Sequence, residues 1–379
     1  MTREAVIVSY ARTGLAKSGR GGFNITPPMT LGAHAVKHAV AKSGVEADFI
    51  EDCYMGNNAH GAANIGRQVA LLAGMPVTTA GVSINRFCSS GLQSIAMAAN
   101  HIRGDGADCV VAGGVESISI PGGGMPREAI DPELVKIAPA IFMAMIDTAD
   151  IVAKRYGVSR EAQDAFSLES QLRMAAAQQA GLFKDEIVPI EIETPEGMAW
   201  HTQDEGIRFD ATLESIAGVK LLAEGGTLTA ASSSQICDGS SAALVVSEAA
   251  LKRYNLTPMA RVHTLTVTAG DPVIMLEEPL FATDKALARS GLSIGDIDLY
   301  EVNEAFAPVP MAWLKHTGAD PDRLNVNGGA IALGHPLGAS GTKLMATLLH
   351  ALKARGGKYG LQTMCEGGGV ANVTIVERL

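Results

Sequence analysis

Apolar residues recur along this chain at the spacings of both helices and strands. Within residues 88–102 they fall three and four positions apart, which predicts a helix with one apolar face. The predicted face comprises Leu92, Ile95, Ala96, Ala99 and Ile102. Residues 343–355 show the same spacing, and Gly356 directly after them predicts the left-handed end of a helix. Strand-like runs at 107–113 and 298–302 alternate with these helices, which favours an α/β layered fold.

The two predicted helices belong to a weak internal repeat. Ser90-Gly91 opens the first helix and Gly113-Gly114-Val115 ends the next strand, while Ser340-Gly341 and Gly368-Gly369-Val370 do the same in the second half. Two halves built alike would bring both helix openings near a common centre. A chance match of such short segments is the alternative.

The chain changes character between about 120 and 225. A helix is predicted over 160–180, with Ser159 as its N-cap and Gly181 as its stop. Its predicted apolar face comprises Ala165, Leu168, Leu172, Ala175 and Ala176. A polar stretch follows at 194–210, so this part is interpreted as an inserted loop domain that covers a site.

Composition narrows the class of protein. With 379 residues the chain exceeds one ordinary core, so two or more packed units are expected. Hydrophobic residues at 47% and charged residues at 18% exclude a disordered chain. The net charge is −10 without a long basic run, so no nucleic-acid partner is expected. The long charge-free stretch 68–85 contains Gly, Pro and Thr and predicts no membrane contact.

Cysteine usage indicates a reducing compartment. The cysteines are odd in number, widely spaced and free of C-x-x-C pairs, which argues against a disulfide scaffold or a zinc ribbon. They are Cys53, Cys88, Cys109, Cys237 and Cys365. The chain starts on a strand-like run without a basic-then-apolar leader, so a cytoplasmic location is expected.

The segment NRFCSSGLQ (85–93) places Cys88 at the start of an amphipathic helix. Unpaired N–H groups and the positive end of the helix dipole favour a thiolate there, which predicts a lowered thiol pKa. Small neighbours leave room for an acyl group. The alternative is a buried structural cysteine.

The segment GGAIALGHPLGASG (328–341) places His335 in a glycine-rich loop before the second helix. Histidine can take a proton from a thiol near neutral pH. A structural or exposed histidine is one alternative. A phosphate-binding loop is another, but the chain lacks G-x-x-x-x-G-K-[ST] and a strand-placed G-x-G-x-x-G.

Two further segments carry candidate chemistry. In CEGGGVAN (365–372), Cys365 ends a strand-like run, and backbone N–H groups from Gly367 onward are candidates to bind an oxyanion. In VNEAFA (302–307), Asn303 and Glu304 follow a strand, with a simple helix cap as the alternative. G-x-S-x-G is absent, so a serine hydrolase is unsupported.

Together these four segments resemble the thiolase family, in the family's order and over nearly the whole chain. The motifs are N-x-x-C-x-S-G-L-Q, N-E-A-F-A, G-G-x-x-x-x-G-H-P-x-G-x-S-G and C-x-G-G-G. The resemblance implies two similar α/β halves in a five-layered αβαβα arrangement with an inserted loop domain. The N-terminal half would be 1–120 plus about 226–256, the loop domain over the CoA site 121–225, and the C-terminal half 257–379.

The resemblance also implies residue roles. Cys88 would be the nucleophile that carries the acyl group, and His335 would accept its proton and help polarise the thioester oxygen. Cys365 would move protons to and from the α-carbon of the second acyl-CoA or the attacking CoA. Asn303 would hold a water that completes one oxyanion hole. The backbone N–H groups of Cys88 and Gly367 would form the other.

Four further positions match substrate contacts of the family. Glu304 would orient the polar segment that contains it. Ser234 and Arg208 would touch CoA, the latter near its adenine-phosphate end. Met275 would line the acyl pocket.

Some segments depart from the family pattern. Ala231-Ser232 stands where Gly-Asn is usual, and Ala144-Met145 where short-chain biosynthetic members have His-Met. Two charged residues occur within 276–279, and PGGGMP (121–126) opens the loop domain. These departures bear on substrate chain length and on assembly, and they leave the catalytic set intact.

The resemblance predicts an acetyl-CoA C-acetyltransferase or 3-ketoacyl-CoA thiolase of fatty acid metabolism, including β-oxidation. It would interconvert two acyl-CoA molecules with a 3-ketoacyl-CoA plus CoA through an acyl-cysteine, without metal or other cofactor. A homotetramer or homodimer is expected. The alternatives are a decarboxylating ketoacyl synthase-like enzyme and a non-catalytic, lipid- or CoA-binding thiolase-like protein.

Overall fold

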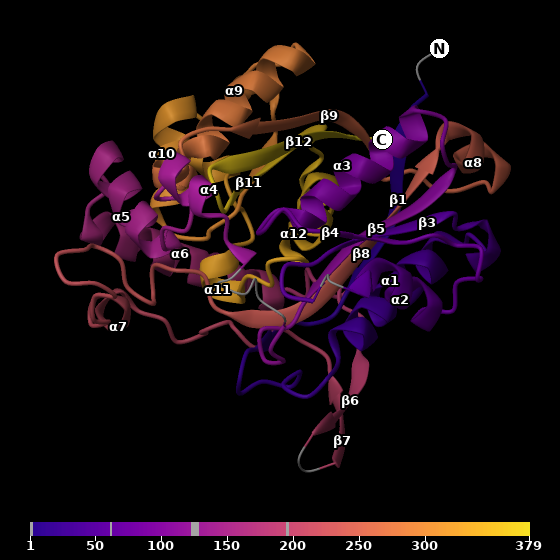
Figure 1. Cartoon of the computed structure of the whole chain (residues 1–379), viewed down its shortest axis with the longest axis horizontal. Coiled ribbons are helices and arrows are strands. Elements are labelled where there is room, and N and C mark those ends of the chain that lie inside the picture. The colour runs from indigo at the N-terminus through magenta and orange to yellow at the C-terminus, as the bar shows by residue number, and fades with distance from the viewer. Residues whose placement is uncertain (1–2, 61–62, 123–128, 195–196) are drawn as a thin grey trace.

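A mixed β-sheet runs through the molecule and organises its helices (Figure 1). The structure is a computed structural model that describes residues 3–60, 63–122, 129–194 and 197–379. The first elements are β1 (Ala5–Arg12), β2 (Ala16–Lys17), α1 (Pro28–Ser43), β3 (Asp52–Gly56), α2 (Ile65–Leu72), β4 (Val82–Ile84), α3 (Ser90–Arg103) and β5 (Cys109–Glu116).

An inserted segment separates β5 from β8, the strand that returns to the sheet. Its elements are α4 (Pro132–Ile137), α5 (Met145–Tyr156), α6 (Arg160–Gln179), β6 (Ile190–Thr194), β7 (Gly197–His201) and α7 (Leu213–Ala217). The remaining elements are β8 (Cys237–Ser247), α8 (Glu248–Arg253), β9 (Ala260–Ala269), the 3₁₀ helix η4 (Pro272–Glu277), α9 (Glu278–Ser290), β10 (Leu299–Val302), α10 (Pro308–Thr317), α11 (Ala330–Leu333), α12 (Ser340–Arg355), β11 (Tyr359–Glu366) and β12 (Val370–Arg378).

The two halves of the sheet repeat one topology. In the first, β1 and β5 flank β8 antiparallel to it, and β3 lies parallel to β5. In the second, β9 and β11 flank β12 antiparallel to it, and β10 lies parallel to β11. The internal repeat expected from the glycine motifs is therefore present. A short β1–β9 pairing, Val6 with Arg261 and Ile7 with Ala260, joins both halves into one continuous sheet.

Three hydrophobic clusters show how the layers stack. One packs α1 and α2 on the outer face of the N-terminal strands, and another packs α9 and α10 on the outer face of the C-terminal strands. A third holds α3 and α12 between the two halves. Figure 1 shows this order from α1 and α2 through α3 and α12 to α9 and α10. The predicted five-layered α/β architecture is confirmed.

The second half connects its equivalent strands directly, without an insertion. β11 and β12 are joined by the turn at 367–369, whereas residues 117–236 lie between β5 and β8. Figure 1 shows the β6–β7 hairpin projecting from the body. Of PGGGMP, residues 123–126 lie outside the described part of the chain, and the domain limits at 120, 225 and 256 stay predictions. No helix in the described ranges is both long and apolar enough to cross a membrane.

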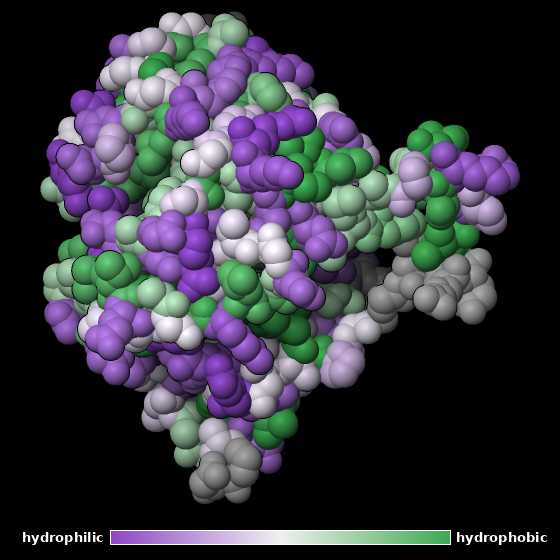
Figure 2. Space-filling view, turned by 90° about the vertical axis from the view of Figure 1, so that its left-hand side faces the viewer, coloured by the Kyte–Doolittle hydropathy of each residue, from purple (hydrophilic) through white to green (hydrophobic). Residues whose placement is uncertain are grey.

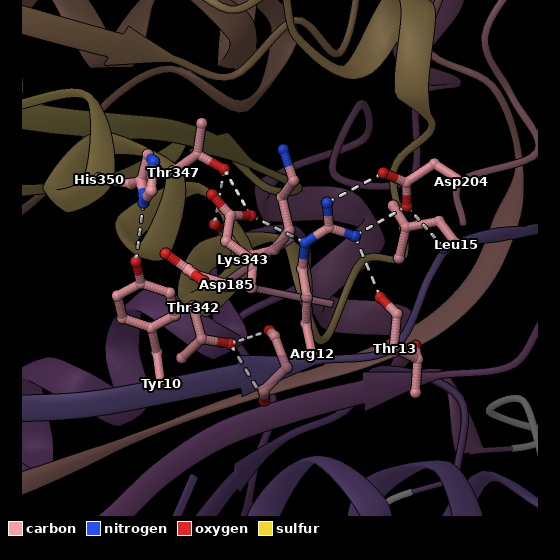
Figure 3. Close-up of polar contacts among 12 residues, drawn as sticks. Tyr10, Arg12, Thr13, Leu15, Asp185, Asp204, Thr342, Lys343, Thr347 and His350 are labelled. Carbon is pink, nitrogen blue, oxygen red and sulfur yellow. Dashed lines mark hydrogen bonds and ion pairs between the residues drawn. The ribbon is translucent and has the colours of Figure 1, made fainter. Parts of the chain in front are cut away.

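A buried group of ionisable side chains joins the inserted segment to both halves. This junction cluster consists of Arg12 on β1, Glu186 and Asp204 in the inserted segment, Glu301 on β10 and Lys343 on α12. Arg12 donates to both Asp204 oxygens, at 2.7 and 2.9 Å, and its Nε donates to Glu186 at 2.9 Å. Figure 3 shows Arg12 reaching Asp204, with Lys343 beside it.

The helices were predicted at the right positions, but the buried face of one helix was predicted wrongly. The predicted face of α3 is buried, Ser159 caps α6 as expected, and Gly356 ends α12 with a φ of 69°. The predicted apolar face of α6 is wrong, because Ala165 and Leu172 are exposed. α6 instead buries polar side chains, and one of them, Ser170, hydrogen-bonds Glu304 at 2.7 Å.

Candidate active site

Cys88 lies in the turn that precedes α3, with 3% of its surface exposed. Phe87 before it has a φ of 46°, a left-handed conformation that is uncommon for a bulky residue. The Ser90 side chain accepts a hydrogen bond from the Arg86 N–H and donates one to the Phe87 carbonyl, which stabilises the turn. Strained backbone of this kind is concentrated at functional sites. The turn therefore fixes where the Cys88 sulfur points.

The environment of Cys88 raises the pKa of its thiol well above the usual value. Burial is the main cause, and the nearby Cys365 and Glu366 act in the same direction. The expected lowering by the helix N-terminus is therefore wrong for the unliganded protein, since desolvation of a thiolate outweighs the dipole. Cys88 is a neutral thiol that needs a base to become a nucleophile.

His335 lies in the loop between α11 and α12, and the main chain holds it firmly. Its N–H donates to the Gln235 carbonyl at 2.9 Å. Gly334 before it has a φ of 112°, and a Cβ there would lie 2.5 Å from the Cys237 sulfur, so only glycine fits. Burial lowers the pKa of His335 to about 4, which makes the ring a neutral base at physiological pH.

Hydrogen bonds assign the proton on the His335 ring. The Ser340 hydroxyl donates to the Pro336 carbonyl at 3.0 Å, so its oxygen is free to accept from His335 Nδ1, 2.6 Å away. Nε2 then carries the lone pair, and it lies 3.3 Å from the Asn303 side-chain nitrogen. Nε2 is the atom of this ring that can accept a proton.

Asn303 and Glu304 follow β10. Asn303 donates its backbone N–H to the Thr363 carbonyl at 3.1 Å, which holds it beside β11. Its Oδ1 is buried and has no partner within the described ranges, so it can accept a hydrogen bond from a water or a substrate. Glu304 is fully engaged, because it accepts hydrogen bonds from Ser170, Asn325 and the Ile331 N–H.

Cys365 lies near the end of β11 and is 0% exposed. Burial raises the pKa of its thiol to about 12, and Glu366 adds to the rise. Gly367 follows in the turn to β12, where a Cβ would lie 3.2 Å from the Phe87 ring. The turn after Cys365 therefore packs directly against the turn that carries Cys88.

The structure brings the four motifs of the sequence together. Asn303 and His335 share a hydrogen bond, Cys88 and Cys365 are electrostatic neighbours, and a Ser89–Glu366 hydrogen bond joins the segments of the two cysteines. The helix openings pack glycine against glycine, since a Cβ at Gly91 would lie 2.8 Å from the Gly338 carbonyl oxygen. The segments that carry the two thiols, the neutral imidazole and the unpaired amide oxygen are thus in contact with one another.

The predicted substrate contacts lie around this centre. Arg208 is exposed and lines a hollow with Ala231, Gln235, Gln171 and Ile331. Ser234 is half-buried and donates its N–H to the Ala305 carbonyl at 2.9 Å. Met275 on η4 is 2% exposed and belongs to the same hydrophobic cluster as Cys365.

Several residues of the site carry no motif of their own in the sequence. Ser340 orients His335, and Glu116 holds the histidine loop by accepting the Gly338 N–H at 3.0 Å. The Gln235 side chain donates to Gly206 and Ala332 carbonyls at 2.9 and 2.7 Å and so ties the Arg208 segment to α11. Only Ser340 had a signal, its place five residues after His335 in the glycine-rich loop.

Across the described residues, no group of three or more His, Cys, Asp or Glu side chains is placed to hold an ion. What the site offers is a neutral thiol that can become a nucleophile, a neutral imidazole that can accept a proton, a second buried thiol and an unpaired amide oxygen. This set suits acyl transfer through a covalent intermediate.

Two family models match the chain and together span nearly all of it. The one described as "Thiolase, N-terminal domain" matches residues 5–249, and "Thiolase, C-terminal domain" matches residues 256–378. A steroid 3-ketoacyl-CoA thiolase of Mycobacterium tuberculosis is 44% identical over 99% of this chain and 94% of its own length. An acetyl-CoA acetyltransferase of Escherichia coli is 38% identical over the full length of both chains.

Solved structures agree with these matches. The crystal structure of human mitochondrial 3-ketoacyl-CoA thiolase superposes with a TM-score of 0.92 at 36% identity, over 100% of both chains. The Bacillus anthracis acetyl-CoA acetyltransferase gives a TM-score of 0.94 at 33% identity, over 100% of this chain and 99% of the other.

Proposed function

Because the chain belongs to the thiolase family, we propose that it transfers acyl groups through a covalent intermediate on Cys88. The activity itself is that of a thiolase, an acetyl-CoA C-acetyltransferase or C-acyltransferase. The observation that carries the proposal is the neutral His335 ring, whose Nδ1 is hydrogen-bonded to Ser340 and whose Nε2 faces Asn303.

In the direction of thiolysis, the Cys88 proton passes to Nε2 of His335 and the thiolate attacks the 3-keto carbon of the substrate. The bond between C2 and C3 breaks, so the acyl group remains on Cys88 and the acetyl-CoA enolate leaves. Cys365 gives its proton to the α-carbon of that enolate. Each oxyanion donor is worth roughly 3–4 kcal/mol in such a step. The Cys88 and Gly367 N–H groups and a water on Asn303 are the proposed donors.

The second half of the cycle returns the enzyme. The Cys365 thiolate takes the proton of the CoA thiol, and CoA attacks the acyl group on Cys88. Acyl-CoA leaves, and the Cys88 thiolate recovers its proton from His335. Run backwards, the same steps condense two acetyl-CoA molecules. Two separated half-reactions predict ping-pong kinetics.

The CoA moiety is proposed to bind beneath the inserted segment, residues 121–225. Arg208 and Ala231 line one hollow there, and Gln235 links that hollow to the His335 loop. In this arrangement Arg208 meets the phosphates, Ser234 lies along the pantetheine, Glu304 orients Asn303, and Met275 borders the acyl group. No metal or other cofactor takes part.

The substrates are acyl-CoA thioesters and CoA. The relatives are named both as acetyl-CoA acetyltransferases and as 3-ketoacyl-CoA thiolases, one of them a steroid enzyme. Degradation of fatty-acid or steroid-derived 3-ketoacyl-CoA in the cytoplasm is the proposed role. Assays with short, branched and ring-bearing 3-ketoacyl-CoA would rank these substrates.

A homodimer or homotetramer is proposed for the assembled enzyme. Apolar side chains exposed on and after α4 support it, since the described part of the chain leaves them uncovered: Leu134, Val135, Ile137 and Phe142. Figure 2 shows apolar surface on a lobe that projects from the body. Light scattering on the enzyme as it elutes from a size-exclusion column would measure the mass of the assembly, and the mass of a monomer would contradict the proposal.

Loss of acetoacetyl-CoA absorbance on addition of CoA tests the activity and the nucleophile together. Wild type should turn over, and Cys88→Ala should lose at least 10³-fold in kcat because no covalent intermediate can form. Cys109→Ala is the matched control, since this buried cysteine lies on β5 and belongs to none of the site's contacts. Activity that survives in Cys88→Ala would refute the assignment.

A further inference from the structure

Glu366 is a buried acidic side chain that the proposed reaction does not use. It is the last residue of β11, directly after Cys365 and directly before Gly367. Its side chain is 0% exposed. In the family motif C-x-G-G-G this position is not specified, so the motif itself gives the carboxyl no role.

The carboxyl joins the two segments that carry the cysteines. The Ser89 hydroxyl donates a hydrogen bond to Glu366 Oε1. Ser89 follows Cys88 and stands at the N-cap of α3, yet its side chain makes no capping bond there. The hydroxyl therefore serves Glu366 and not the helix. The packing of Gly367 against the Phe87 ring is a second contact between the same two segments.

Few charges surround the carboxyl. Arg86, in the turn before α3, favours its ionised form, and Lys285 on α9 lines the same hollow of about 590 Å³. The stretches of β9 and β12 that line this hollow carry no charge. Glu366 contributes to raising the pKa of both thiols, and for Cys88 Glu116 on β5 acts in the same direction.

The second oxygen of Glu366 is left open. Oε2 is buried and has no hydrogen-bond partner in the described part of the chain. Burial raises the pKa of Glu366 to about 8, although Ser89 and Arg86 pull it down. The group is thus mainly neutral at pH 7 and becomes an anion above pH 8, beside two thiols that must themselves become anions.

We propose that Glu366 is a positioning residue that holds the Cys88 turn through Ser89 and, once ionised at alkaline pH, opposes formation of the Cys88 thiolate. The proposal rests on the proposed role of Cys88 as nucleophile. Two neighbouring anions in a buried site repel each other, so each disfavours the ionisation of the other. At neutral pH the carboxyl is protonated, and the thiol can give its proton to His335 without this opposition.

Alkylation of Cys88 measures its thiolate directly. We would treat the assembled enzyme with iodoacetamide between pH 6.5 and 9.5 and follow each cysteine by peptide mass. In Glu366→Gln the Ser89 contact keeps an acceptor and the charge is gone. The expected rate equals that of wild type within twofold at pH 6.5 and is about five- to tenfold higher at pH 9.5, as a shift of roughly one pKa unit requires.

Ser89→Ala is the second variant and changes only the hydrogen bond. Without this donor the ionised form of Glu366 is less favoured, so the pKa of Glu366 rises. Alkylation should then exceed the wild-type rate near pH 8.5 and fall back toward it at pH 9.5. Glu301→Gln is the matched control, because Glu301 on β10 is as deeply buried but is not among the charges that act on either thiol, and its profile should follow wild type.

The outcomes separate this proposal from the proposed function. A rate ratio of Glu366→Gln to wild type that stays constant from pH 6.5 to 9.5 would overturn the role of Glu366 alone. So would a Ser89→Ala profile identical to wild type, should Glu366→Gln fail to fold. Labelling of Cys53 or Cys109 before Cys88 would overturn both proposals together.

Discussion

The active site and the junction cluster are both buried and rich in ionisable groups, yet they treat charge in opposite ways. In the junction cluster, Arg12 forms a forked pair with Asp204 and also binds Glu186, so that charges persist in the interior. In the active site, Cys88 and His335 are buried without a counter-ion, and both are neutral. A buried group with an ion partner can stay charged, whereas a buried group without an ion partner is neutral.

This difference fits the work of each region. The junction cluster joins β1, the inserted segment and α12, so a lasting ionic contact serves its structural role. The active site must create a charge only when a substrate arrives, and burial makes that charge costly until the oxyanion donors share it. The lasting charges of the junction cluster stabilise the fold, and the charges that form only during the reaction carry out the chemistry of the active site.

Removing the base should have the largest effect. His335→Ala leaves the Cys88 thiol with no proton acceptor in a site where its ionisation is opposed by burial. We expect kcat to fall by about 10²–10⁴-fold, the range typical of a general base. His350→Ala on α12 is the control, since that ring contacts Tyr10 outside the site, and it should keep its activity. Equal losses in both variants would contradict a specific role for His335.

The pH dependence of kcat/KM is a second test of His335 as the base. With a pKa near 4, His335 in the free enzyme is a competent base far below the usual histidine range. We expect kcat/KM to persist down to about pH 5. The same shift in pKa affects the stability of the fold. The unfolded ring takes up a proton near pH 6.5 and the folded ring only near pH 4, so the free energy of unfolding falls as the pH drops between these values. An acid limb near 6.5 in kcat/KM would contradict burial as the cause.

Breaking the junction cluster should lower the stability of the fold without a direct effect on the reaction. Arg12→Met leaves Asp204 and Glu186 as buried charges without their partner. The free energy of unfolding should drop by about 3–5 kcal/mol, measured by urea denaturation. Arg155→Met is the matched control, because Arg155 is 55% exposed although its Nη1 also donates to both oxygens of a carboxylate, that of Glu277. Its effect should stay within about 1 kcal/mol.

Arg12 also holds the pKa of Asp204 below its usual range, against the effect of burial. A carboxylate with a depressed folded pKa contributes stability above its unfolded pKa and loses it as pH falls through the folded value. This contribution should be missing in Arg12→Met. The difference between wild type and variant should therefore shrink below about pH 4, and a constant difference would point to lost packing.

Neutralising Glu301 should have the smallest effect. Burial raises the pKa of Glu301 to about 8, so its contribution to stability is complete below its unfolded pKa near 4.3 and is lost as pH rises toward 8. Glu301→Gln cannot ionise, so its free energy of unfolding should exceed that of wild type increasingly between pH 5 and 8.5, by an amount on the order of 1 kcal/mol. Glu169→Gln, on an exposed face of α6, should show no such trend.

The sequence predicted the positions of the main helices because local signals determine them. Glycine pairs mark both helix openings, and the apolar face of α3 matches its buried side. The same reasoning failed for α6, whose buried side holds Gln163, Ser167 and Ser170. Periodicity assumes that apolar residues face inward. Here the inward face supplies hydrogen bonds, such as that of Ser170 to Glu304, so tertiary contacts override the pattern.

The candidate site was found by motifs, but its protonation was not. A helix N-terminus lowers a thiol pKa in water-exposed surroundings, and no local signal reveals that Cys88 is buried among other acids. The pairing of Ser89 with Glu366 joins residues 277 positions apart and is equally invisible along the chain. The left-handed φ of Phe87 carries no sequence mark, since glycine is the usual residue there.

Direct detection of the acyl-enzyme tests the central claim. Brief incubation of wild type with acetyl-CoA or acetoacetyl-CoA, followed by acid quenching and peptide mass mapping, should show one acetyl group on the peptide containing Cys88. Addition of CoA before quenching should remove it. An acetyl group found on Cys365 instead, or no acyl-enzyme while turnover continues, would contradict the account.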